Sequence, residues 1–375
     1  MPCEEALALP LRALSNWTSW PTLAGRQWFS IEGTGMGFFS RSFLVVATLM
    51  GLASCGPGDA GERAAGAADP STGAEGTAST PEYMPPGVQA VSFLGDTLRA
   101  PQQSAAVREV YLARYQEAED ELAADPEDVD ALIWMGRRTA YLGQHREAID
   151  IYAHAISLHP DDARLYRHRG HRYLTVREPV RAIEDFERAV ALIQGTPDQV
   201  EPDGLPNALG IPTSTLHFNI WYHLGLAHYA MGDFQAAEAA YRACMDASVH
   251  PDSVVATAYW LYLTLRRLGR DDAASEVLES IHADLDIIES TPYLDLLLLF
   301  KGERTLEDLT GPAGADATLQ STTTAYGLGA WHLVEGREDE ARATFRRILE
   351  APDQWSAFGY MAAEAELARM AASAM

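Results

Sequence analysis

The chain has 375 residues, of which 47% are hydrophobic, so it can bury a sizeable core and global disorder is excluded. Its 53 acidic and 28 basic residues give a net charge of −25, and because such a field repels polyanions we expect no nucleic-acid partner. The three cysteines have neither metal-pair nor redox spacing, and the stretches rich in Ala, Leu and Glu favour helices.

Residues 1–35 show no periodicity, and they precede residues 36–55, which have the features of an export signal and should therefore begin the protein. We therefore interpret them as an upstream extension, with Met36 as the initiator. On the other side of that segment, residues 56–87 are rich in Gly, Ala, Pro, Ser and Thr, a composition that cannot bury enough apolar surface to order itself. They should form a flexible linker.

Residues 36–55, which lie between these two segments, have the features of an export signal. Arg41 supplies a positive charge, and residues 43–52 form an apolar run that is too short to span a bilayer. The run ends on Leu-Ala-Ser-Cys at Cys55, which resembles the bacterial lipobox. The resemblance implies lipidation of Cys55 and a location in the bacterial cell envelope, at the outer membrane or the periplasmic face. A simple secretory signal and a buried core helix are the alternatives.

A repeat of 34 residues governs residues 105–370. Gly136 and Gly170 are one period apart, and the residues around them recur in the same order in five copies. Two helices that cross closely need a small residue at the crossing and a large aromatic side chain to fill the adjoining gap. Because one hairpin cannot bury its own apolar face, successive hairpins should stack. The recurring residues include Gly136, Gly143 and Tyr152; Gly170, Ala182 and Phe186; Gly225, Gly232 and Tyr241; Gly269, Ala274 and Leu278; and Gly329, Gly336 and Phe345.

This pattern resembles the tetratricopeptide repeat (TPR). The resemblance implies an all-α fold, a right-handed superhelical α-solenoid of TPR helical hairpins, over residues 105–370. Runs such as IWMGRRTAYLG (133–143) and WYHLGLAHY (221–229) further resemble a group of bacterial TPR lipoproteins to which no activity is assigned.

Several segments interrupt or close the repeat. Residues 195–215 are rich in Pro and Gly and lengthen the spacing between the second and third copies, which predicts a loop insert. A degenerate hairpin should precede the last copy, with residues 293–300 as its clearest helix. Helices at 105–124 and 355–370 should cover the first and last repeats.

The first helix of each hairpin should line a concave groove whose predicted face is basic and aromatic. Arginine forks bind carboxylates in bidentate fashion and tyrosines add stacking surface, so this face predicts a site for a protein or acidic peptide partner. The predicted ligand-binding residues are Arg137, Arg164, Arg167, His171, Asn219, Tyr222, Tyr259 and Arg266. With Arg and His in place of the usual Lys and Asn, four of them resemble the carboxylate clamp of TPR domains that grip peptide C-termini: Arg164, Arg167, His171 and Asn219.

An alternative interpretation keeps the arginines for internal contacts. The turn at residues 201–204 of the insert (Glu-Pro-Asp-Gly) would fold back onto them and hold the insert in place. Arg169 and Arg172 would pair with nearby acids, namely Glu184, Asp185, Glu201 or Asp203. The two interpretations are compatible if the insert acts as a lid.

The chain contains no motif of known catalytic chemistry, so we expect no catalytic residues, no metal and no cofactor. His168 and His171 have the spacing of metal ligands on a helix, but the flanking arginines would repel a dication. The leading hypothesis is an envelope-anchored adaptor or scaffold. One rival is an envelope enzyme or glycan-binding subunit, with the 195–215 insert as a lid and Glu201 and Asp203 as a carboxylate pair. Another is a scaffold that assembles a complex on its convex faces.

Overall fold

The computed structural model describes residues 85, 87–310 and 322–373. The predicted upstream extension (1–35), the predicted signal (36–55) with Cys55, and all of the predicted linker except residues 85 and 87 lie outside the described residues. None of the helices described is long and apolar enough to cross a membrane.

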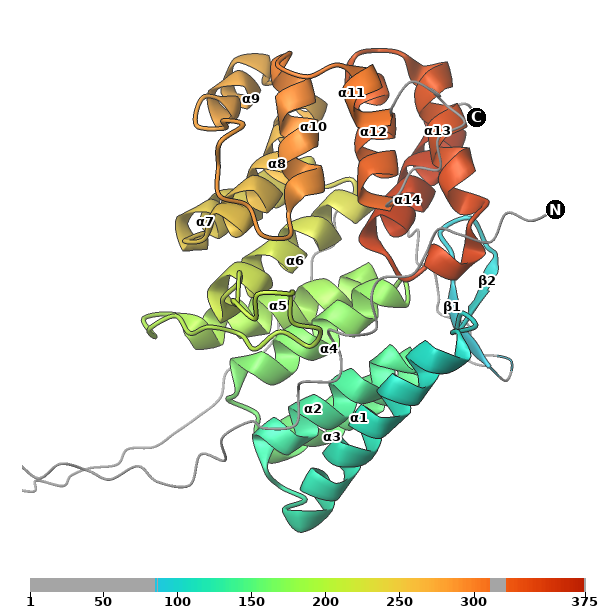
Figure 1. Ribbon diagram of the computed structural model, residues 1–375, viewed down its shortest axis with the longest axis vertical. Coiled ribbons are helices and arrows are strands. Elements are labelled where there is room, and N and C mark those ends of the chain that lie inside the picture. The colour runs from blue at the N-terminus through green and yellow to red at the C-terminus, as the bar shows by residue number, and fades with distance from the viewer. Residues whose placement is uncertain (1–84, 86, 311–321, 374–375) are drawn as a thin grey trace, which may run out of the picture. The chain divides into compact units, whose positions relative to one another are not determined.

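Helices dominate the described chain, and ten of them pair as five hairpins (Figure 1). This confirms the prediction of an all-α solenoid of helical hairpins. The pairs are α2 (Val129–Tyr141) with α3 (His145–Leu158), α4 (Ala163–Thr175) with α5 (Pro179–Ile193), α6 (Leu216–Met231) with α7 (Phe234–Ala247), α8 (Pro251–Arg267) with α9 (Asp271–Leu278), and α12 (Thr322–Val334) with α13 (Glu338–Leu349). The degenerate region holds α10 (Thr291–Lys301) and α11 (Leu306–Thr310), and the flanking helices are α1 (Ala105–Ala124) and α14 (Phe358–Ser373).

In four of the hairpins, a glycine of the first helix contacts an aromatic ring of the second helix. A Cβ atom on Gly136 would lie 2.4 Å from the Tyr152 ring, and one on Gly225 would lie 2.6 Å from the Tyr241 ring. The same contact joins the equivalent residues of the second and last hairpins, Gly170 with Phe186 and Gly329 with Phe345. The helices therefore approach more closely than any side chain would allow, which explains why the sequence repeats a glycine and an aromatic residue.

The turn between paired helices uses a left-handed backbone conformation. Gly143, Gly232 and Gly336 occupy this position with φ of 83°, 82° and 73°. The second hairpin has Arg177 there, at φ 65°, and no other described residue besides glycine has a positive φ. A residue with a Cβ atom costs about 1 kcal/mol or more in this conformation, so contacts of the Arg177 side chain must compensate.

Those contacts come from the C-terminal helix α14. The Arg177 guanidinium donates to the Glu364 carboxylate at 2.9 and 3.0 Å, and both side chains are 1% exposed. Two residues further along α14, the buried Glu366 pairs with Arg267 of α8 at 2.6 Å. Because α14 also packs on α6, α12 and α13, the predicted closing helix runs along the turn ends of several hairpins as well as covering the last one.

A short β-hairpin, which the sequence did not predict, precedes α1. Strand β1 (Val88–Val91) pairs antiparallel with β2 (Thr97–Arg99). Arg146 of α3 donates to the Gln89 carbonyl at 2.9 Å, and the indole N–H of Trp355 donates to the Arg99 carbonyl at 2.6 Å. The β-hairpin thus connects the first helical hairpin to the segment that leads into α14, beside which it lies in Figure 1.

Candidate functional site

Helices α2 and α4 present three of the predicted arginines on one surface, which we call the α2–α4 wall. An aspartate caps each helix: Asp128 accepts a hydrogen bond from the backbone N–H of Ala131, and Asp162 accepts one from that of Arg164. Because the caps fix where both helices begin, residues spaced by three or four positions share one face. The wall consists of Ile133, Trp134, Arg137, Arg138, Arg164, Arg167 and His168.

The insert folds back onto this wall. An antiparallel bridge between Val200 and Thr215 closes its base. Beyond the base, the Glu201 carboxylate lies 2.9 Å from Nε of Arg167, and these side chains are 9% and 10% exposed. Glu201 therefore brings a negative charge from the insert into a buried contact with the wall.

The wall also binds the backbone of the turn at 201–204. Arg137 donates to the carbonyl of Pro202 at 2.7 Å, and Arg138 donates to the carbonyl of Gly204 at 3.0 Å. Gly204 lies so close to the wall that a Cβ atom on it would be 1.7 Å from the Tyr141 hydroxyl. This turn is held by charge and backbone hydrogen bonding, with no large apolar side chain among these contacts.

Arginines and carboxylates gather where the turn meets the wall. Arg137 lies near Arg167 and near Asp203 of the turn, and Arg167 pairs with Glu201. Arg172 lies close to both arginines. Burial lowers the pKa of Arg172 to about 10, and no carboxylate pairs with it among the residues described. Burial, with a contribution from Arg167, also lowers the pKa of His168 well below its ordinary value. His168 is therefore neutral at pH 7, and the arginines give the wall its charge.

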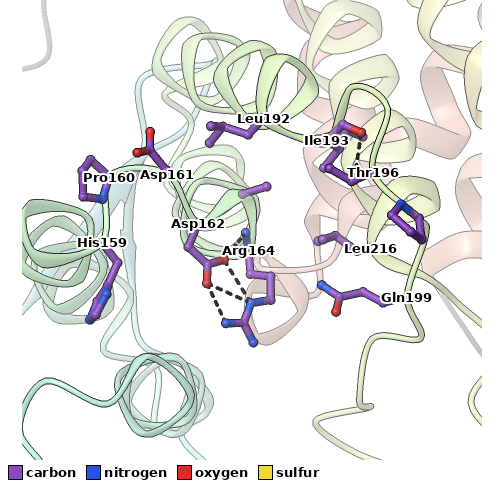
Figure 2. Close-up of a pocket in the computed structure, with 12 residues that line it drawn as sticks. His159, Pro160, Asp161, Asp162, Arg164, Leu192, Ile193, Thr196, Gln199 and Leu216 are labelled. Carbon is purple, nitrogen blue, oxygen red and sulfur yellow. Dashed lines mark hydrogen bonds and ion pairs between the residues drawn. The ribbon is translucent and has the colours of Figure 1, made fainter. Parts of the chain in front are cut away.

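Two adjacent cavities remain open between the wall and the insert. The narrower, of about 220 Å³, is lined by Trp134, Arg137, Arg164 and residues 199–202. The wider, of about 690 Å³, lies between the α3–α4 turn and residues 196–199, and Figure 2 shows Arg164 at its floor. Arg164 lines both cavities and is held by Asp162 and Asp130, each at 2.6 Å, of which the hydrogen bond to Asp162 contributes most to raising its pKa.

A family model of the tetratricopeptide repeat matches residues 218–248, which lie in the α6–α7 hairpin. That hairpin has the same contact between a glycine and an aromatic ring as the first, second and last hairpins. The protein therefore contains a tetratricopeptide repeat (TPR). No curated protein matches the chain.

Several solved structures of other proteins are also similar to this chain. A crystal structure of MamA is 19% identical, with a TM-score of 0.35, and the match covers 54% of this chain and 90% of that one. YrrB, described as a TPR protein with an unusual peptide-binding site, is 12% identical, with a TM-score of 0.35 and coverage of 69% and 98%. A chain of the Cut9–Hcn1 hetero-tetramer of the APC/C is 17% identical, with a TM-score of 0.37 and coverage of 64% and 40%.

Three of the predicted ligand-binding residues of this TPR protein belong to its core. Tyr259 is 0% exposed. Tyr222 is also buried, and its hydroxyl lies 3.0 Å from that of Tyr293 in α10. Asn219 is buried and donates to the Ser214 hydroxyl at 3.0 Å. The prediction that they face an open groove is corrected, because α10 packs onto α8 and covers the inner face of the third and fourth hairpins.

His171 and Arg266 also lie away from the two cavities beside the α2–α4 wall. The half-buried His171 ring packs edge-on against Phe358, at the start of α14, with ring centroids 5.1 Å apart. Arg266 lies 2.9 Å from Asp271 and 3.0 Å from Glu335, where α8 meets the turn between α12 and α13. The structure therefore brings together Arg137, Arg164 and Arg167 of the predicted set.

The alternative of internal pairing describes part of what the structure contains. Arg169 donates to both carboxylate oxygens of Asp185, at 2.7 and 2.8 Å, while Glu201 pairs with Arg167 instead of Arg169 or Arg172. The site also includes Trp134, over whose ring Arg137 lies at 4.6 Å and which is not among the predicted ligand-binding residues. The repeat pattern does not mark its exposure, since that depends on the path of the insert.

Among the residues described, no three His, Cys, Asp or Glu side chains gather as metal ligands. The thiol of Cys244 is buried, 3.2 Å from the Thr257 hydroxyl, and burial raises its pKa to about 12. Cys244 is therefore a core residue and is not activated as a nucleophile.

Proposed function

We propose that this TPR protein is an adaptor of the bacterial cell envelope that binds a protein partner through an acidic peptide segment, and that the α2–α4 wall is the binding surface. The observation that carries the proposal is that three arginines of the wall already bind a peptide segment of this chain, through the Glu201 carboxylate and the carbonyls of Pro202 and Gly204, in a protein whose net charge is −25. Buried guanidinium groups favour carboxylates because charge-assisted hydrogen bonds strengthen where water is excluded.

The two cavities support the same proposal. They expose Arg164, Arg137 and the ring of Trp134 beside the insert, so an incoming segment would meet both charge and an aromatic surface. Residues 199 and 200 form the opposite side of the narrower cavity. Neither backbone polar group of Val200 makes a hydrogen bond to another described residue, which leaves an edge for an extended peptide.

The proposal predicts that peptides selected on the full chain from a random decapeptide library are enriched in Asp and Glu. A variant with Arg137→Ala and Arg167→Ala should bind the selected peptides at least tenfold more weakly, and raising NaCl from about 50 to 500 mM should weaken binding to the unmodified chain. Fluorescence anisotropy measures both effects.

A control variant with Arg242→Ala and Arg346→Ala removes the same charge from the second helices of two other hairpins, and it should bind like the unmodified chain. Equal losses in the two double variants would mean that net charge alone attracts the peptides. Selection of neutral or basic peptides would refute the acidic partner.

Attachment to the membrane is the second part of the proposal and rests on the lipobox-like sequence that ends at Cys55. Bacteria that express the chain and are fed an alkyne fatty acid should label it, and mass spectrometry should place the label on an N-terminal Cys55. The variant Cys55→Ser should lose the label, whereas Cys244→Ser should keep it. A labelled Cys55→Ser variant, or an unlabelled parent chain, would refute the anchor.

No specific observation favours the rival enzyme with a Glu201–Asp203 pair. Glu201 is held by Arg167, and burial raises the pKa of Asp203, with nearby Glu289 adding to the effect. These contacts join the insert to the protein and leave the Glu201 carboxylate little room to reach a substrate.

A further inference from the structure

We infer that residues 201–204 of the insert are an internal ligand of the α2–α4 wall, so that an acidic segment of a partner binds by displacing them. The inference rests on the proposed function for the identity of the displacing segment. The occupancy of the wall by the insert is visible in the structure and does not depend on that function.

The contacts of the turn are those by which a peptide is bound. Glu201 supplies a carboxylate to Arg167, and the carbonyls of Pro202 and Gly204 accept hydrogen bonds from wall arginines. A loop that served only to stabilise the fold would be expected to bury apolar side chains against it. This insert instead leaves Leu205, Leu209 and Ile211 exposed, at 51%, 67% and 45%.

The contacts of the turn determine what can replace it. A hydrogen bond exchanged with water contributes about 1 kcal/mol, so the carbonyls of Pro202 and Gly204 can leave the wall at modest cost. The buried guanidinium of Arg167 costs more to leave unpaired, so the carboxylate of an incoming acidic segment must take the place of Glu201. The base of the insert is held separately, by the bridge between Val200 and Thr215 and by the contact of Thr213 with Glu289. The turn at 201–204 can therefore leave the wall while both ends of the insert keep their contacts.

Because the turn at 201–204 is part of the same chain as the wall, a partner must bind the wall more strongly than the turn does in order to displace it. A docked segment on a short flexible linker has an effective concentration on the order of 1 mM, so a free peptide with the same contacts cannot compete at micromolar concentration. A partner segment must make additional contacts, and the wall offers them at Arg164 and Trp134, which remain accessible in the two cavities. The insert thus selects against acidic peptides that lack these additional contacts.

The test uses the chain's own sequence as the probe. A labelled peptide of residues 199–206 (acetyl-QVEPDGLP-amide) is titrated into the full chain and into the variant Glu201→Ser, Pro202→Gly, Asp203→Ser, in which the turn loses its ligand groups. The variant should bind the peptide at least tenfold more tightly than the parent chain. The same peptide with glutamine for glutamate, or the variant with Arg137→Ala and Arg167→Ala added, should lose at least tenfold in affinity.

A second measurement does not require the triple variant to bind. Glu201→Gln should speed cleavage of the chain before Asp203 by endoproteinase Asp-N at least tenfold, because the turn must leave the wall to enter the protease. Glu184→Gln, which removes an exposed carboxylate from α5, should leave this rate unchanged. Gly204→Ala should act like Glu201→Gln, because its Cβ atom would collide with the Tyr141 hydroxyl.

Equal affinity of the peptide for parent chain and triple variant, or unchanged cleavage before Asp203 in Glu201→Gln, would overturn the inference. If the peptide of residues 199–206 binds as expected but library selection yields no acidic peptides, the internal ligand stands and the proposed function fails. If library peptides bind the wall without speeding cleavage before Asp203, the proposed function stands and the internal ligand fails.

Discussion

Glu364→Ala is expected to lower the free energy of unfolding by about 3–5 kcal/mol, because it leaves a buried guanidinium without its carboxylate. Arg177 and Glu364 are each 1% exposed and share two hydrogen bonds, of 2.9 and 3.0 Å. Urea denaturation followed by circular dichroism measures the loss. The pair joins the second hairpin to α14, which lies far away in the sequence, so the variant should also unfold over a broader range of urea concentration.

An exposed pair of the same chemistry provides the control. Glu338 is 61% exposed and pairs with Arg342 at 2.8 Å, so Glu338→Ala should change the free energy of unfolding by less than about 1 kcal/mol. Similar losses in Glu338→Ala and Glu364→Ala would show that burial adds nothing to the contact.

The substitution Arg177→Gly distinguishes the energetic cost of the backbone conformation at this position from the contribution of the arginine side chain. Glycine is the residue that the other turns use, and it should relieve about 1 kcal/mol of strain at φ 65°. The variant also leaves the Glu364 carboxylate buried without a counter-ion, at a cost of about 3–5 kcal/mol. We therefore expect a net loss of about 2–4 kcal/mol, even though the change restores the residue typical of the repeat, and a gain in stability would contradict this balance.

The hairpins could be predicted from the sequence because their causes are local. Gly136 and Tyr152 are close in the chain, and the requirement for close helix crossing acts within one repeat. A pattern that recurs five times therefore identifies the hairpins and the turns between their helices. The exception at Arg177 can also be seen in the sequence, as a position where the turn lacks its glycine. The sequence does not show, however, that Glu364 is the residue that pairs with Arg177.

The inner face could not be predicted, because its exposure depends on contacts between distant segments. Tyr222 and Tyr259 have the helical positions of groove residues, but α10 returns to cover them through Tyr293. Periodicity states which side of a helix a residue occupies and does not state what packs on that side. The β-hairpin escaped prediction for a similar reason, since its short strands pack on the rest of the fold through contacts such as that of Arg99 with Trp355.

The candidate site was predictable only as a pair of alternatives. The sequence placed eight residues on one face, and in the structure three of them lie together, namely Arg137, Arg164 and Arg167. It could not show whether the turn at 201–204 reaches them, because loop paths depend on few and weak contacts. The structure combines both interpretations: the turn occupies part of the wall, and Arg164 remains accessible beside it.

The two kinds of contact that join distant segments differ in strength. Arg177 and Glu364 of α14 form an ion pair between side chains that are each 1% exposed. The 201–204 turn meets the wall through two backbone hydrogen bonds that water can replace and through the pair of Glu201 with Arg167, in which an incoming carboxylate can replace Glu201. The first should keep the α2–α4 wall in one geometry while the second opens. A rigid surface with a displaceable cover is what a selective peptide-binding site requires.

Gly225→Val is expected to lower the free energy of unfolding by about 2–3 kcal/mol, because the α6–α7 crossing has no room for a side chain. A Cβ atom at this position would lie 2.6 to 2.8 Å from three atoms of the Tyr241 ring. Tyr241 is itself 0% exposed and stacks on Trp260, so the ring cannot move without disturbing the core. Thermal and urea denaturation measure the change.

A double-mutant cycle shows whether the loss comes from this contact. Tyr241→Leu shortens the facing side chain, so the combination with Gly225→Val should be more stable than the sum of the single losses by about 1 kcal/mol or more. Ala239→Val, at an exposed position of α7, measures the intrinsic cost of valine in a helix and should stay near 0.5 kcal/mol. Additive losses, or a Gly225→Val variant no less stable than Ala239→Val, would mean that the glycine is not required by the crossing. In that case the repeated pairing of glycine with an aromatic ring would need another explanation than close helix approach.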